Sequence, residues 1–178
     1  LDMSRIESGK IHLEETEVSL SDVLHDLKTI ISGQIHAKQL ELYMDAMDVT
    51  NEDVYCDKTR LNQVLLNLLS NAIKYNREGG SITISETSDE QYVRVSVADT
   101  GLGMNKNVMK HIFDKFYQGD ESHATFGNGL GLAMVKRILE LSDASITVES
   151  TPDKGSVFTV VLEKAQKTNL ERGGENEC

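Results

Sequence analysis

One short stretch of the chain combines the end of a strand, a carboxylate and two glycines: Val97-Ala98-Asp99-Thr100-Gly101-Leu102-Gly103-Met104. The alternating apolar residues before it predict a strand that ends at Asp99. Glycines let a backbone turn tightly and approach a flat ligand closely. An ionised carboxylate only accepts hydrogen bonds, so an exocyclic amine such as that of adenine is a suitable donor to it. The same pattern also makes an ordinary turn, so the stretch alone leaves both interpretations open.

Composition restricts the class of protein. The chain has 178 residues, 39% of them hydrophobic, which suits one domain with a substantial core. Its formal net charge of -11 argues against a nucleic-acid-binding protein, because such proteins need clustered Lys and Arg. No apolar run is long enough to span a bilayer, and the start has no signal-peptide pattern. Cys56 and Cys178 have no metal-binding or redox spacing, and we expect Cys56 to be buried, in a reducing compartment.

Apolar residues at helical spacing predict three main helices. Ser19 is placed to cap the first, whose apolar face comprises Leu20, Val23, Leu24, Leu27, Ile30 and Ile31. Asp57 is placed to cap the second, which continues to about Tyr75 and whose apolar face comprises Leu61, Val64, Leu65, Leu68, Leu69 and Ala72. The third opens with residues 129–132, and its inner face comprises Leu132, Val135, Ile138 and Leu139. A shorter helix is expected over residues 108–117, with Ile112, Phe113 and Phe116.

Alternating apolar and polar residues predict strands at residues 40–44, 54–56, 81–87, 92–98, 145–150 and 156–162. Residues 88–91 join two of them into a hairpin, and a turn at residues 151–155 joins the last two. This mixed order predicts an α/β (α+β) two-layer sandwich, a mixed β-sheet packed on one face by about three helices.

The two ends of the chain are expected to lie outside the predicted two-layer sandwich. Residues 1–17 read as the end of a helix followed by an extended linker, which suggests that further chain lies upstream. The main domain is expected over residues 18–163, and residues 164–178 are expected to be a disordered polar tail. Residues 118–128 lack periodicity and are expected to form a mobile loop.

A polar stripe on the second helix is a candidate binding feature. Gln63, Asn67, Asn71 and Lys74 fall within an arc of about 80°, at about 100° per residue. An amide oxygen suits Mg²⁺, which keeps most of its waters and shares phosphate oxygens, and a lysine supplies a point charge for a phosphate. Such stripes are commonly just solvated faces, and we favour that interpretation for Gln63.

A second glycine-rich turn is Gly127-Asn128-Gly129-Leu130-Gly131-Leu132. Glycines before a helix leave N–H groups free to bind a phosphate. The turn is not a Walker loop, because no Lys-Ser/Thr follows its last glycine, and by itself it is also compatible with a flexible junction. Together with the Asp99 turn and the polar stripe, it predicts a nucleotide pocket.

In this order the segments resemble the catalytic, ATP-binding domain of bacterial sensor histidine kinases, within the Bergerat-fold ATPases and kinases. Residues 67–75 resemble the N box, 99–104 the first glycine box, 112–117 the F box and 127–132 the second glycine box. Gly155-Ser156-Val157-Phe158 resembles the region that follows, and residues 1–10 the end of a dimerisation helix. The resemblance extends from about Val18 to Leu162.

The resemblance implies a site for ATP and Mg²⁺. It implies that Asn71 holds Mg²⁺, that Asn67 and Lys74 assist catalysis, that Tyr75 flanks the nucleotide and that Asp99 binds the adenine amine. It further implies nucleotide-binding roles for Lys74, Gly101, Gly103, Met104, Lys115, Gly127, Gly129, Leu130, Gly131, Leu132 and Ser156. Gln118 stands where many members have Arg, and Asn128 and Ser156 stand where Thr is frequent; none of these differences removes a required group.

The implied activity is that of a protein-histidine kinase. ATPases of this fold carry a Glu where this chain has Asn67, and an amide cannot take a proton from water, so transfer to another nucleophile is favoured over hydrolysis. No acceptor box of the form His-(Glu/Asp)-x-x-x-Pro occurs around any of the five histidines, His12, His25, His36, His111 and His123. We expect these histidines to be structural or exposed, and the γ-phosphoryl group to pass to a histidine on a dimerisation domain outside the chain and then to a response-regulator aspartate.

The expected partners are therefore that dimerisation domain and a receiver domain, and not a nucleic acid. The chain itself is expected to be a cytoplasmic monomer, whereas its parent is expected to be a homodimer, with a membrane anchor possible in the parent. Two alternatives are a serine protein kinase of the same fold and a nucleotide-sensing pseudokinase. The helix end at the N-terminus argues against the first, and intact Asn71, Lys74 and Asp99 argue against the second.

Overall fold

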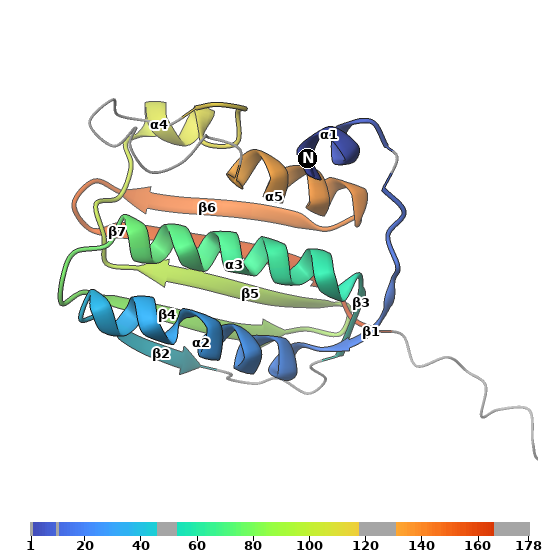
Figure 1. The fold of residues 1–178 in the computed structure, drawn as a ribbon, viewed down its shortest axis with the longest axis horizontal. Coiled ribbons are helices and arrows are strands. Elements are labelled where there is room, and N and C mark those ends of the chain that lie inside the picture. The colour runs from blue at the N-terminus through green and yellow to red at the C-terminus, as the bar shows by residue number, and fades with distance from the viewer. Residues whose placement is uncertain (1, 10, 46–52, 118–130, 166–178) are drawn as a thin grey trace, which may run out of the picture.

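The computed structural model describes residues 2–9, 11–45, 53–117 and 131–165 (Figure 1). The helices are α1 Asp2–Glu7, α2 Leu20–Ala37, α3 Lys58–Lys74, α4 Lys106–His111 and α5 Gly131–Leu141. The strands are β1 Thr16–Ser19, β2 Glu41–Asp45, β3 Asp53–Cys56, β4 Ser81–Ser88, β5 Tyr92–Asp99, β6 Ser145–Thr151 and β7 Gly155–Glu163. Within these ranges, no helix is both long and apolar enough to cross a membrane.

A mixed sheet forms one layer of the fold. Its five strands run in the order β2-β4-β5-β7-β6, with β2 parallel to β4 and the other neighbours antiparallel. Figure 1 shows α2, α3 and α5 side by side across one face of this sheet. The predicted two-layer sandwich is therefore confirmed. A second, two-stranded sheet pairs β1 with β3, and this pairing was not predicted from the sequence.

The predicted caps explain where α2 and α3 begin. The Ser19 hydroxyl accepts a hydrogen bond from the Asp22 N–H at 3.4 Å, and Asp57 Oδ1 accepts one from the Arg60 N–H at 3.1 Å. Both bonds satisfy N–H groups that the first turn of a helix leaves unpaired. The predicted apolar face of α3 is buried throughout.

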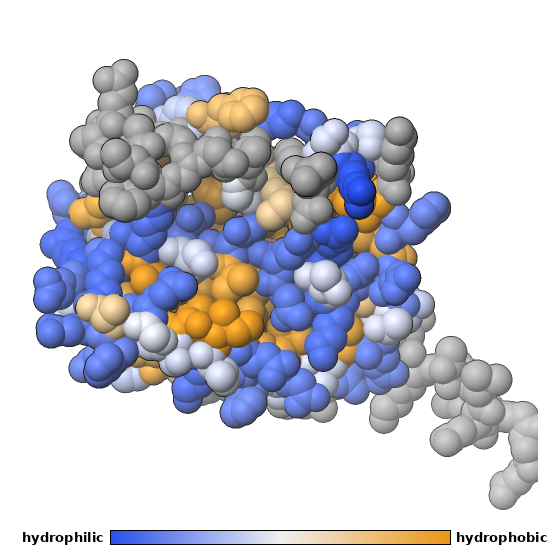
Figure 2. All heavy atoms as spheres, viewed as in Figure 1, coloured by the Kyte–Doolittle hydropathy of each residue, from blue (hydrophilic) through white to orange (hydrophobic). Residues whose placement is uncertain are grey.

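The core lies between the helices and the sheet. The inward positions of the hairpin strands are all buried, namely Ile82, Ile84, Val93, Val95 and Val97. One expected core residue is wrong: Ile30 is 59% exposed, because it lies about 80° around α2 from the centre of the buried face. Figure 2 shows mainly hydrophilic side chains on the helix-covered face, with apolar side chains gathered near its centre.

Two expected boundaries also need correction. The helix expected over residues 108–117 ends at His111, and Phe116 has a φ of 61° that is incompatible with a helix and is 69% exposed. Lys164 and Ala165, which were expected to belong to the disordered polar tail, are held to the domain: the Lys164 N–H donates to the Gln91 carbonyl at 2.9 Å and the Ala165 N–H donates to the Asp53 carbonyl at 3.0 Å. The expected tail beyond residue 165 and the expected loop at residues 118–128 lie outside the described residues.

Candidate functional site

A cavity of about 280 Å³ opens beside the end of β5 and the C-terminal half of α3. It is lined by Asn71, Ala72, Tyr75, Asp99, Leu102, Gly103, Met104, Val108, Ile112, Tyr117, Leu132, Ser156 and Phe158. Most of these side chains are apolar, and a few polar groups converge among them. That combination is typical of a small-molecule site, where apolar walls hold a flat ligand and the polar groups fix its orientation.

The Asp99 carboxylate is the charged group of this cavity among the described residues. Asp99 is the last residue of β5, and its Oδ1 accepts hydrogen bonds from the Gly101 N–H at 2.9 Å and the Ser156 N–H at 3.3 Å. Burial raises the pKa of Asp99, and these two N–H groups lower it to a smaller extent. Because both N–H groups bond to Oδ1, Oδ2 is the oxygen left to accept from a ligand.

The two glycines of the turn are required by the protein's own packing. A side chain at Gly101 would overlap the carbonyl oxygen of Tyr75, at the end of α3. Gly103 has a φ of 63°, and a side chain there would overlap the carbonyl oxygen of Thr151. These glycines therefore bring α3, the end of β5 and the β6–β7 turn together around the cavity, and Gly103 also lines it.

Sequence reasoning missed the polar network behind Asp99. Asn76 is 6% exposed, its Nδ2 donates to the Ser81 carbonyl at 3.0 Å, and its Oδ1 accepts from the Thr100 hydroxyl at 3.2 Å. The Thr100 hydroxyl in turn accepts from the Ser81 N–H at 2.9 Å. The network ties the end of α3 to both strands of the hairpin and so fixes the position of Asp99. The sequence did contain one indication of this role, since Asn76 is a polar residue that directly follows the predicted end of the helix.

A second missed residue is Ser150 on β6. Its hydroxyl accepts a hydrogen bond from the Met104 N–H at 2.7 Å and lies 2.8 Å from the hydroxyl of Ser156. Ser150 occupies one position in a strand of alternating polar and apolar residues, where a serine is expected to face solvent. The sequence pattern therefore gave no sign of its role.

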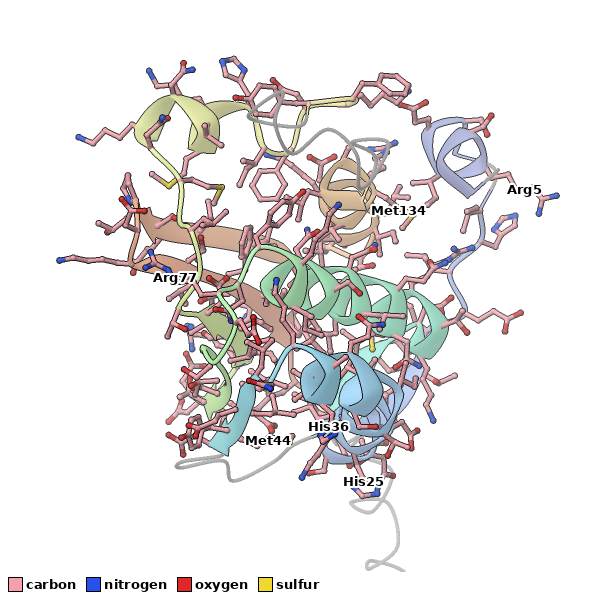
Figure 3. The ribbon with its side chains drawn as sticks, turned by 60° about the vertical axis from the view of Figure 1, so that its left-hand side comes forward. Arg5, His25, His36, Met44, Arg77 and Met134 are labelled. Atoms are coloured by element: carbon pink, nitrogen blue, oxygen red, sulfur yellow. The ribbon has the colours of Figure 1, made fainter. Side chains whose placement is uncertain are left out.

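Arg77 contacts the β6–β7 turn. Its guanidinium donates to the Asp153 carbonyl at 2.6 Å and lies 3.6 Å from the Asp153 carboxylate, and the Asp153 N–H donates to the Leu102 carbonyl at 2.7 Å. Figure 3 shows Arg77 extending at the end of the molecule where α3 finishes. These bonds hold the β6–β7 turn against the turn that follows Asp99.

The structure brings together about half of the expected site residues. Those that line the cavity are Asn71, Tyr75, Asp99, Gly103, Met104, Leu132 and Ser156. Asn67 faces the start of α5, since a Cβ on Gly131 would lie 3.8 Å from the Asn67 amide oxygen. The Lys74 ammonium lies 5.1 Å from the centre of the Tyr75 ring. Gly127, Gly129 and Leu130 lie outside the described residues.

Lys115 lies apart from this group. Its ammonium pairs with the Glu7 carboxylate of α1 at 2.7 Å, and it borders a separate shallow pocket beside α5. Lys115 is not among the described residues that line the Asp99 cavity. The structure therefore does not bring this expected phosphate ligand to the site.

Other reactive groups in the described chain lie away from the cavity. The four described histidines are all exposed: His12, His25, His36 and His111. The His111 ring lies 2.8 Å from Asp114 Oδ2. Figure 3 shows His25 and His36 on the outer side of α2. This matches the expectation for these four histidines, and His123 lies outside the described residues. Cys56 is buried, as expected, and burial raises the pKa of its thiol to about 11, so it stays protonated at neutral pH.

The described residues alone supply no cluster of charged metal ligands at this site. No group of three His, Cys, Asp or Glu side chains that could hold a metal occurs in the part of the chain that the structure describes. Asn71, which lines the cavity, offers one amide oxygen. That donor set fits Mg²⁺ held mainly by phosphate oxygens and water.

Comparison with known proteins adds independent information. A family model described as "Histidine kinase-, DNA gyrase B-, and HSP90-like ATPase" matches residues 56–166. The sensor protein GacS of Pseudomonas syringae pv. syringae is 38% identical over 187 residues, which cover 98% of this chain and 21% of that protein. The sensor histidine kinase RcsC of Escherichia coli strain K12 is 36% identical over 162 residues, which cover 90% of this chain and 17% of RcsC. The chain thus spans about a fifth of the length of these relatives.

Solved structures show the same fold. Full-length ShkA in complex with AMPPNP superposes with a TM-score of 0.81 at 28% identity, over 92% of this chain and 34% of ShkA. The histidine kinase ThkA in complex with the response regulator TrrA superposes with a TM-score of 0.74 at 26% identity, over 92% of this chain and 46% of ThkA.

Proposed function

Since this chain belongs to the family of histidine kinase-, DNA gyrase B- and HSP90-like ATPases, we propose that it is the ATP-binding catalytic domain of a sensor histidine kinase. The observation that carries the proposal is the arrangement of Asp99. One carboxylate oxygen is held by two backbone N–H groups, and the other is left for a donor in an apolar cavity. The exocyclic amine of adenine is such a donor.

The walls of the cavity suit a purine ring. Leu102, Met104, Ile112, Leu132 and Phe158 supply apolar surface, and Tyr75 lies at the end of α3 on the same cavity. Burial of a flat ring between such side chains contributes affinity, whereas Asp99 contributes orientation and specificity. The structure of ShkA in complex with AMPPNP supports the choice of an adenine nucleotide as ligand.

The phosphates are proposed to lie toward the start of α5. Asn71 is the proposed ligand of Mg²⁺, and the ion would neutralise charge on the phosphate oxygens. Asn67 and Lys74 are proposed to assist from the same face of α3, and the glycines at 127, 129 and 131 to bind phosphates through their N–H groups. Lys115 is left out of this set because it pairs with Glu7.

We further propose that the γ-phosphoryl group passes to a histidine outside this chain. Asn67 cannot act as a base toward water, and positioning together with charge neutralisation is sufficient for transfer to a neutral imidazole. The acceptor is proposed to belong to a dimerisation domain of the parent protein, with a receiver aspartate as the next acceptor. The ThkA–TrrA complex supports the second step, because it pairs a related kinase with a response regulator. The chain by itself is proposed to be a cytoplasmic monomer, and the full-length protein is proposed to be a homodimer.

The adenine assignment can be tested by calorimetric titration with AMPPNP and Mg²⁺. In Asp99→Asn the amide oxygen is expected to take the place of Oδ1, because two N–H groups require an acceptor there. The amide NH₂ then faces the ligand amine, donor against donor, and affinity is expected to fall at least about a hundredfold. Asp143→Asn makes the same chemical change at an exposed residue and is expected to bind like the parent. Equal binding by Asp99→Asn and by the unsubstituted chain would refute the adenine assignment.

A further inference from the structure

Two serines face each other on the strands beside the cavity. Ser150 on β6 and Ser156 on β7 are partners in the strand register, and their hydroxyl oxygens lie 2.8 Å apart. Ser156 lines the cavity and is 7% exposed, whereas Ser150 is not among the lining residues. Ser150 can therefore affect a ligand only through Ser156 or the backbone that it holds.

The proton of each hydroxyl can be assigned from its partners. A serine hydroxyl donates one hydrogen bond and accepts up to two. The Gly155 carbonyl can only accept, so Ser150 donates its proton to it, at 3.0 Å. The Met104 N–H donates to Ser150 Oγ at 2.7 Å. With its own proton used, Ser150 is an acceptor toward Ser156, and the proton between the two hydroxyls belongs to Ser156.

This assignment satisfies both protons inside the protein, as buried polar groups require. It also directs the Ser156 proton toward Ser150, so that Ser156 Oγ presents only lone pairs toward the cavity. Asp99 stands next to it, joined to Ser156 through the 3.3 Å backbone bond, and it presents carboxylate oxygens. The wall formed by Asp99 and Ser156 therefore consists of acceptors.

We propose that Ser150 is a positioning residue that fixes the Ser156 hydroxyl as an acceptor and thereby selects purines with a 6-amino group over purines with a 6-oxo group. The inference rests on the proposed binding of ATP and deepens it by naming how the base is chosen. An amine donates to this wall, directly or through one water. A 6-oxo group meets acceptors only, and unpaired buried acceptors are unfavourable.

The test compares the affinities for ATP and inosine triphosphate, each with Mg²⁺, by calorimetry on the full 178-residue chain. Inosine triphosphate replaces the 6-amino group by oxygen and carries a hydrogen on N1. The unsubstituted chain is expected to bind ATP more tightly than inosine triphosphate. In Ser150→Ala the Ser156 proton loses its acceptor and can turn toward the 6-oxo group, so the ratio of the two affinities is expected to fall about tenfold. Ser150→Thr keeps the hydroxyl and is expected to keep the ratio.

The chain offers a matched control on the same sheet. Ser96 on β5 and Thr159 on β7 form another hydroxyl pair, also 2.8 Å apart and also register partners, and neither residue lines the cavity. Ser96→Ala removes a comparable hydrogen bond, so it is expected to leave the ratio at the parent value. Ser156→Ala is expected to lower the ratio, and adding Ser150→Ala to it is expected to change the ratio no further, because Ser150 acts through the Ser156 hydroxyl.

Three results would overturn the proposed role of Ser150. A Ser150→Ala variant that weakens both nucleotides equally would show a purely structural role and overturn the inference. If that variant does not fold, Ser156→Ala decides alone, and an unchanged ratio there overturns it. A parent that binds no ATP would overturn the proposed function as well, whereas ATP binding with unchanged ratios overturns only the role of Ser150.

Discussion

Two opposing effects act on the carboxyl group of Asp99. Burial disfavours its charged form, and the N–H groups of Gly101 and Ser156 favour it; burial is the larger effect, so the pKa is raised. The proposed function uses the carboxylate as an acceptor, which is the form that burial makes less stable. Asp99 thus carries a conflict between stability and function of the kind that is common at binding sites.

The conflict predicts how stability depends on pH. Folding favours the protonated form of Asp99, so its contribution to stability is fully present below the ordinary pKa of 3.8 and is lost as pH rises through the raised folded-state pKa. Asp99→Asn cannot ionise and escapes this loss. We therefore compare the free energy of unfolding of Asp99→Asn with that of the unsubstituted chain, both measured with urea. The difference, variant minus unsubstituted chain, is expected to be more positive at about pH 7 than at about pH 3. A difference that is the same at both values, or that shifts the other way, would contradict the inferred pKa.

Among the helices, α1 is short and packs mainly against one other element, α5. Its six residues are too few for an independently stable helix, so it depends on packing against α5. Ile6 supplies that packing and is 1% exposed. The Glu7–Lys115 pair is about two-fifths exposed on each side, and ion pairs of that kind add little.

Ile6→Ala is therefore expected to release α1 while the sheet stays folded. Removing a buried isoleucine side chain typically costs about 2–5 kcal/mol, which is more than a six-residue helix can lose and remain docked. Hydrogen exchange is expected to show lost protection for the amides of α1 and unchanged protection for those of α3 and β5. Ile30→Ala removes the same groups from an exposed position and is expected to change stability by less than about 0.5 kcal/mol. Unchanged protection of α1 in Ile6→Ala would contradict this role.

The elements also show which features were predictable. The start of α3 and the β4–β5 hairpin depend on signals within a few residues, a capping aspartate and an alternating pattern, so the sequence predicted both. The parallel pairing of β2 with β4 and the β1–β3 pair join distant segments, and no local signal specifies them. Single residues show the same contrast. The turn that follows Asp99 is a local signal in the sequence, whereas the pairing of Lys115 with Glu7 joins two distant segments and has no local signal.

At the scale of the whole molecule, the site lies at one end of the sheet. The four described histidines are exposed and none lines the cavity. The proposed transfer therefore calls for a second domain that presents the nucleophile. The relatives are about five times as long as this chain, which leaves ample length for such a domain.

Transfer of phosphate between two separate polypeptides can test that division between domains. The chain is mixed with ATP, Mg²⁺ and the separately purified, histidine-bearing dimerisation domain of its parent. Acid-labile phosphate is expected on the added domain, because the proposed acceptor is an imidazole nitrogen. Asp99→Asn is expected to abolish this labelling and Asp143→Asn to leave it unchanged, since only the first alters the cavity. Acid-stable phosphate on the chain itself would instead point to a hydroxyl acceptor and refute transfer to histidine. Labelling that persists in Asp99→Asn would separate the activity from the cavity described here.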